Sequence, residues 1–172
     1  MEKTAGAKTG TVELFLELGK EGLRFLVTGG FAANLYGVER ATYDIDLAIS
    51  PEPAAITGLI SALRRAGYTE VVNINSGKRI AVLKDIAPER IMEMESVRIR
   101  NRKEVDVLIV PSAQFEYLWE YRLEIDYAGT KIPLPNPMDL VHMKEQSSRR
   151  VDREDAKRLR HLIGSKKKQA GR

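Results

Sequence analysis

Cysteine is absent from the 172 residues, which excludes disulfide bridges, thiol nucleophiles and cysteine-ligated zinc sites. Long apolar runs are missing too: glycine, threonine or a charged residue interrupts each apolar stretch, so none is long enough to cross a bilayer. Residues 1–10 contain no apolar core of the signal-peptide type. These absences predict a cytoplasmic protein in a reducing compartment, with no membrane partner.

The composition that remains is that of a globular protein, with 43% hydrophobic and 30% charged residues. A chain of this length is expected to build one domain around one core. We predict a disordered N-terminus over residues 1–10, a single domain over residues 11–163 with C-terminal helices over 136–163, and a basic disordered tail over 164–172.

Positive charge is concentrated at the C-terminal end of the chain. Residues 144–172 hold 11 Lys and Arg against 4 Asp and Glu, whereas residues 1–143 hold 17 against 20. Two interpretations stay open for this segment. Its helical part is either a binding surface for a polyanion such as tRNA or another nucleic acid, or a solvated basic helix.

Strand and helix patterns alternate along the chain. Residues 44–50 alternate strictly between apolar and polar or small side chains, as expected of a strand with one buried face. Further strands are predicted at 23–27, 68–74, 79–83 and 105–110, an edge strand within 86–102, and helices after residues 11, 31, 53, 112, 136 and 152. This order predicts an α/β (α+β) fold, with a mixed β-sheet and flanking helices.

Two aspartates share one face of the predicted strand 44–50. Asp44 and Asp46 stand two positions apart and therefore point to the same side. A buried pair of carboxylates is costly unless a cation neutralises it, and Mg²⁺ or Mn²⁺ prefers such oxygen ligands. Asp106 lies between Val105 and Val107 in a second apolar strand. If the two strands are neighbours, the three carboxylates form the ligand set of a two-metal site. The alternative is that they line a solvated sheet face.

Gly29 and Gly30 follow the first predicted strand and precede a short helical segment. Glycines allow a ligand to approach the backbone closely, and free N–H groups at the start of a helix attract phosphate. Arg40 and Lys144 are further candidates for phosphate contacts. Tyr36, Tyr43 and Tyr68 are expected to pack in the fold rather than to stack on a base.

The spacing from Gly29-Gly30 through Asp44-Ile45-Asp46-Leu47 to Asp106 resembles the nucleotidyltransferase superfamily that includes DNA polymerase beta. The longer run from Gly37 to Leu47 is similar to small bacterial members, among them minimal, abortive-infection (type IV toxin), aminoglycoside and lincosamide nucleotidyltransferases. Segments 132–144 and 152–155 resemble the C-terminal part of such proteins. One position departs from the pattern, because many relatives have Ser where this chain has Gly30.

The resemblance implies transfer of a nucleoside monophosphate (NMP) from a nucleoside triphosphate (NTP), such as ATP, to a hydroxyl group of RNA, protein or a small molecule. It implies that Asp44, Asp46 and Asp106 hold two Mg²⁺ or Mn²⁺ ions, and that Gly29 and Gly30 hold the triphosphate. Two other hypotheses stay open. The chain is a non-catalytic relative that binds nucleotide or a partner protein, for example in a toxin–antitoxin pair, or it is a basic nucleic-acid-binding protein without an active site.

Overall fold

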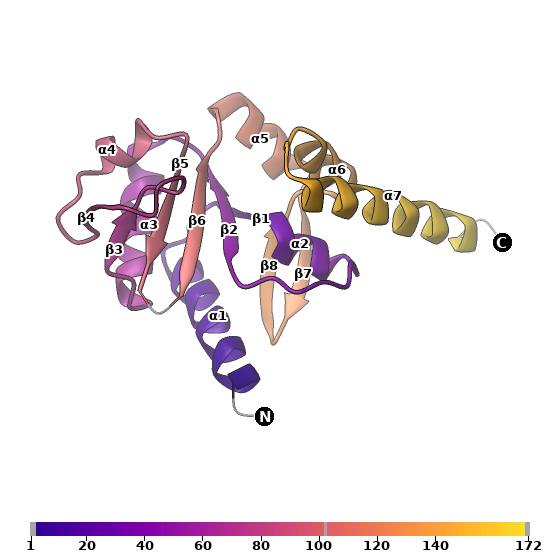
Figure 1. Cartoon of the computed structure of the whole chain (residues 1–172), viewed down its shortest axis with the longest axis horizontal. Helices are drawn as coiled ribbons and strands as arrows, with labels where there is room; N and C mark the ends of the chain where they lie inside the picture. Colours follow the sequence, from indigo (N-terminus) through magenta and orange to yellow (C-terminus); the bar gives the residue numbers. More distant parts are fainter. Residues whose placement is uncertain (1–2, 102, 171–172) are drawn as a thin grey trace.

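The computed structural model of the chain describes residues 3–101 and 103–170. Its main sheet has six strands: β1 (Leu26–Thr28), β2 (Ile45–Ile49), β3 (Glu70–Val72), β4 (Arg79–Val82), β5 (Ser96–Arg100) and β6 (Glu104–Ile109). They lie in the order β1-β2-β6-β5-β3-β4 (Figure 1). β2 and β6 run parallel, while the other neighbouring pairs run antiparallel. The mixed sheet confirms the predicted fold class.

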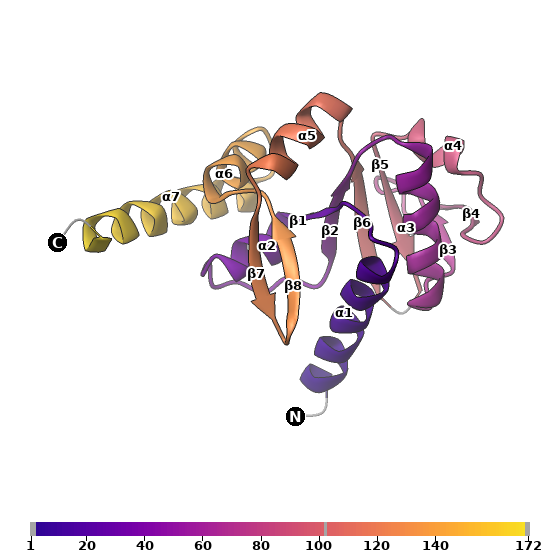
Figure 2. The ribbon, with the colours of Figure 1, turned by 180° about the vertical axis from the view of Figure 1, so that it is seen from behind.

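Seven helices and a hairpin complete the described part of the chain. The helices are α1 (Lys3–Lys20), α2 (Gly29–Leu35), α3 (Pro53–Arg65), α4 (Pro88–Met92), α5 (Ser112–Glu120), α6 (Pro137–Glu145) and α7 (Arg150–Ala170). The hairpin consists of β7 (Leu123–Tyr127) and β8 (Thr130–Leu134). Seen from behind, α1 and α3 lie over the sheet, and α7 extends away from it (Figure 2). None of the helices in the described ranges has the length and apolarity to span a bilayer.

The sheet buries one face in the main core because its strands alternate. Ile45, Leu47 and Ile49 of β2 join Val105 and Val107 of β6 in the core cluster. The polar side chains between them therefore point to the opposite face. α3 covers the apolar face with Ile56, Leu59, Ile60 and Leu63, which recur at helical spacing.

The structure adds α4 and the hairpin β7–β8, which the sequence analysis did not predict, and three predicted stretches differ from it. α1 begins at Lys3 rather than after residue 11, and it buries Leu14, Phe15 and Leu18 while Leu16 is half exposed. The strand predicted within 86–102 is β5, which lies inside the sheet between β6 and β3 and not at its edge. α7 begins at Arg150 and continues to Ala170, past the expected end at residue 163.

Candidate functional site

The turn after β1 brings the backbone against a carboxylate. β1 pairs with β2 so that Thr28 lies opposite Asp46, and the next residue, Gly29, has a φ of 61°. This left-handed conformation favours glycine. A Cβ atom on Gly29 would also collide with the Asp46 carboxylate. Gly29 is therefore required here by both its backbone angle and its neighbour.

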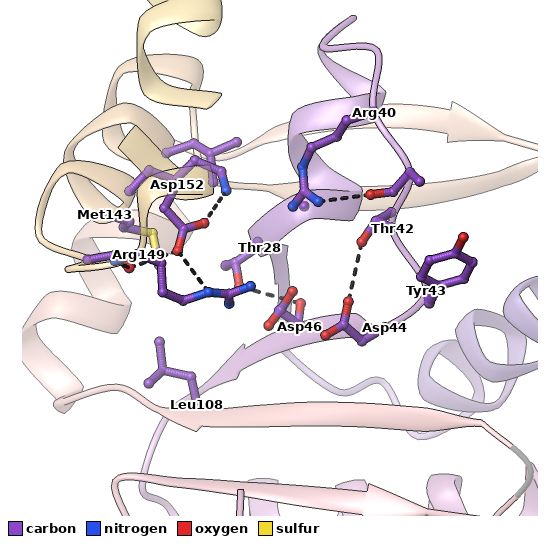
Figure 3. Close-up of a pocket in the computed structure, with 16 residues that line it drawn as sticks. Thr28, Arg40, Thr42, Tyr43, Asp44, Asp46, Leu108, Met143, Arg149 and Asp152 are labelled. Carbon is purple, nitrogen blue, oxygen red and sulfur yellow. Dashed lines mark hydrogen bonds and ion pairs between the residues drawn. The ribbon is translucent and has the colours of Figure 1, made fainter. Parts of the chain in front are cut away.

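Asp44 and Asp46 open into a cavity of about 390 Å³, shown with its lining residues in Figure 3. The Thr42 hydroxyl donates to Asp44 Oδ1 at 3.3 Å. Within the described part of the chain, neither aspartate has an ion-pair partner. The carboxylate pair predicted from the sequence is thus at the surface of a cavity of ligand size, with its charge not matched by a direct salt bridge.

Burial and the neighbouring carboxylates shift the pKa of Asp46. Burial raises the pKa of its carboxyl to about 6, and the nearby charges of Asp44 and Asp106 add to the effect. Lys144 and Arg149 oppose the rise. The negative charge of Asp46 is therefore less stable than that of an ordinary aspartate, as expected of a carboxylate placed to bind a cation.

A buried carboxylate fixes two cations beside the cavity. Asp155, with 1% of its surface exposed, accepts from Lys144 Nζ at 2.8 Å and from Arg40 Nε at 3.0 Å. Lys144 also donates to Asp152 at 2.9 Å. Both cations predicted as phosphate contacts line the cavity, and both are anchored to the C-terminal helix α7.

The space that a side chain at position 30 would need is filled. A Cβ on Gly30 would overlap Arg40 Nη2 and come within 2.8 Å of Thr42 Oγ1. At this position, where the pattern that the sequence resembles often has a serine, the chain places a guanidinium and a threonine hydroxyl beside the backbone. Both groups donate hydrogen bonds of the type that phosphate accepts.

The third predicted carboxylate, Asp106, lies next to the pair, but both its oxygens accept hydrogen bonds from an arginine. β2 and β6 pair so that Asp46 is directly opposite Asp106, which meets the condition under which the three carboxylates were expected to lie together. Arg98 of β5 donates to Asp106 through Nε at 2.6 Å and Nη2 at 2.8 Å. Among the described residues, no group of three or more His, Asp or Glu side chains is arranged to hold a metal ion.

The residues therefore fit a divalent cation in part. Asp44 and Asp46 fit it, because both face the cavity, neither has an ion pair among the described side chains, and Asp46 titrates abnormally. Asp106 does not fit as a third ligand while both its oxygens accept from Arg98. The two-ion site stays a prediction.

Three features of the site escaped the sequence analysis. Arg149 and Asp152 line the cavity and form an ion pair at 3.7 Å, although the only sequence signal was the general positive charge of the C-terminal segment. Tyr43, expected to pack, is 95% exposed at the rim of the cavity. It lies in the segment before β2.

Comparisons with known proteins agree on the fold. Protein-family models give no match, and neither do curated protein sequences. Among solved structures, the lincosamide antibiotic adenylyltransferase LnuA with bound lincomycin matches with a TM-score of 0.58 and 16% identity, over 94% of this chain and 98% of that one. An antigenic nucleotidyltransferase-like protein from Paracoccidioides brasiliensis matches with a TM-score of 0.56 and 18% identity, over 92% and 75%.

A Thermotoga maritima protein proposed to be a nucleotidyltransferase matches with a TM-score of 0.54 and 16% identity, over 90% of this chain and 91% of that one. These likenesses confirm the nucleotidyltransferase-like fold that the sequence resemblance implied. They extend over most of both chains in each case.

Proposed function

We propose that this chain, which has the nucleotidyltransferase fold, transfers an NMP from an NTP to a hydroxyl acceptor and depends on Mg²⁺ or Mn²⁺. The observation that supports this most strongly is the pair Asp44 and Asp46. They are two carboxylates without a salt bridge in the described chain, in a cavity whose other walls carry Arg40, Lys144 and Arg149. A cavity with cations on one side and bare carboxylates on the other suits a triphosphate bound together with a divalent metal.

In this reaction the acceptor oxygen attacks the α-phosphorus, and the bond from that phosphorus to the bridging oxygen of the β-phosphate breaks. The acceptor gives up a proton, and pyrophosphate leaves with the bonding electrons. A divalent cation on Asp44 and Asp46 would neutralise charge on the phosphates. The catalytic demand on the protein is thus positioning and charge stabilisation rather than a covalent intermediate.

The chain's own residues provide that positioning. The Gly29-Gly30 turn begins α2 without a side-chain cap and lines the cavity, so the N–H groups at the start of this helix are suited to donating hydrogen bonds to phosphate oxygens. Arg40 is held through Nε by Asp155, which leaves its Nη2 beside Gly30. Arg149, with 69% of its side chain exposed, is the most exposed of the three cations that line the cavity.

RNA is one acceptor that the surface charge supports. α7 extends away from the sheet (Figure 1) and exposes Arg153 and Lys157, neither of which has an ion pair in the described residues. Arg150 and Arg160 are instead neutralised by Glu154 and Glu145. The unpaired cations suit a phosphate backbone, while protein and small-molecule hydroxyls remain alternatives.

Incubation with labelled NTPs, Mg²⁺ and total RNA, a protein extract or small hydroxyl compounds tests the proposal. Label should move to one acceptor class, stop with EDTA and stop in Asp44→Asn. Asp85→Asn is the matched control, since Asp85 is exposed in the loop after β4 and should leave transfer unchanged. Failure of the wild type to label any acceptor with either metal would refute the proposal.

A second function is favoured by one observation, the capture of Asp106 by Arg98. With its oxygens engaged, Asp106 is poorly placed to accept a proton from an acceptor hydroxyl. The chain would then bind nucleotide, or a partner protein as in a toxin–antitoxin pair, without turnover. Calorimetry separates the two functions: tight nucleotide binding that needs no metal, without release of pyrophosphate, favours the binding protein.

A further inference from the structure

A row of three charged side chains crosses the sheet at the floor of the site. Asp46 on β2 is opposite Asp106 on β6, and Asp106 is opposite Arg98 on β5. Residues in register on neighbouring strands point to the same face. Arg98 therefore stands beside Asp106 in the position next to the carboxylate pair.

Arg98 uses its whole guanidinium group to hold acidic side chains. Its Nε and Nη2 donate to the two oxygens of Asp106 at 2.6 and 2.8 Å, and its Nη1 is 2.9 Å from Glu104 Oε2. The fork of Arg matches the two oxygens of a carboxylate and makes this a strong, directional pair. The Asp106 side chain is only 12% exposed and that of Arg98 25%, so water screens the pair only in part.

The same strand offers an internal comparison two residues away. Arg100 pairs with Glu70 at 3.0 Å on the same face, but those side chains are 35% and 32% exposed. That pair joins β5 to β3, on the side away from Asp46. Arg98 thus differs from an ordinary cross-strand pair by its burial and by its contact with a carboxylate of the site.

We propose that Arg98 excludes a second divalent cation from Asp106, so that this site binds one divalent cation, on Asp44 and Asp46. An ion at Asp106 would have to break two charge-assisted hydrogen bonds and then lie against a guanidinium of like charge. Arg98 is a positioning residue: it supplies one fixed positive charge where a second ion would supply two. This inference rests on the proposed function, and it concerns how many ions the site takes.

The experiment counts Mn²⁺ ions per chain in the presence of a non-hydrolysable NTP analogue, by equilibrium dialysis, and records the electron paramagnetic resonance spectrum. We expect one ion and an isolated-ion spectrum for the wild type. Arg98→Ala should bind two ions, with the altered spectrum of a coupled pair. The double variant Arg98→Ala/Asp106→Asn should return to one ion, and Arg100→Ala should stay at one.

Each other outcome is decisive. Two ions in the wild type, or one ion in a folded Arg98→Ala protein, would overturn the inference and leave the proposed function intact. No bound ion in the wild type would overturn the proposed function and the inference together. If Arg98→Ala fails to give the wild-type circular dichroism spectrum, Arg98→Gln replaces it, because Gln keeps a hydrogen-bond donor at Asp106 without the charge.

Discussion

Asp46→Asn should make the metal-free protein more stable at neutral pH while removing its response to metal. The amide matches the carboxylate in shape but carries no charge. In the wild type, the pKa of Asp46 is about 6, against an ordinary value of 3.8, because of burial first and the charges of Asp44 and Asp106 second. This difference corresponds to about 3 kcal/mol, which is an upper value because water at the cavity mouth screens part of the charge.

The raised pKa of Asp46 also predicts how the stability difference between Asp46→Asn and the wild type changes with pH. A carboxyl whose folded-state pKa is raised favours the folded state while protonated, and this contribution is lost as the pH rises from about 4 through about 6. Asp46→Asn should therefore exceed the wild type by up to about 3 kcal/mol at pH 8, or about 6–12 °C in melting temperature, and the excess should shrink toward pH 4.

Urea denaturation at several pH values between 4 and 8, without metal, measures this difference. Asp85→Asn serves as the control, since the exposed Asp85 should show no such pH-dependent gain. Addition of Mn²⁺ should then stabilise the wild type and not Asp46→Asn. The reasoning fails if Asp46→Asn is less stable than the wild type at pH 8, or if its gain does not change with pH.

Three further substitutions test other parts of the site. Gly29→Ala should lower the free energy of unfolding by more than Gly77→Ala in urea melts: both glycines have left-handed backbones, at φ 61° and 67°, but only a Cβ on Gly29 meets the Asp46 carboxylate. An equal loss, of about 1–2 kcal/mol for each from backbone strain alone, would contradict the contact. Asp155→Asn should cost about 3–5 kcal/mol, because it leaves Lys144 and Arg40 without their buried partner, whereas Glu145→Gln, at the exposed pair with Arg160, should cost less than about 1 kcal/mol. Gly30→Ser should weaken the binding of an NTP analogue in calorimetry, because its side chain would displace Arg40; tighter binding would show that a serine hydroxyl can be added without that loss.

The central strand could be predicted from the sequence because its alternation is strict. β2 lies within one residue of the predicted range at each end, and its two aspartates share a face as their spacing requires. The expectation that Asp46 and Asp106 are neighbours came from two apolar strands that each carry an acid on the face away from the core, and the register Asp46↔Asp106 bears it out. Period-two patterns are visible without knowledge of the partner strand.

The sequence does not predict which charged residues form ion pairs across long distances in the chain. Arg98 lies in a segment whose pattern was ambiguous, because α4 and β5 follow each other within residues 88–100. Asp155 belongs to the helix predicted after residue 152, but nothing in the sequence indicates that it is buried against Lys144 and Arg40. Ion pairs between residues 8 to 115 positions apart leave no periodic trace in a single sequence.

The contact between Arg40 and Asp155 has a consequence for how the protein is made. The two residues are 115 positions apart in the chain. During translation, Arg40 is therefore synthesised long before Asp155. Until α7 has emerged and docked, Arg40 and Lys144 both lack the carboxylate that aims them into the cavity. The phosphate-facing wall is thus fixed last, and a nascent chain that stops before residue 155 has the aspartate pair and the cations but not the carboxylate that holds Arg40 and Lys144 in place.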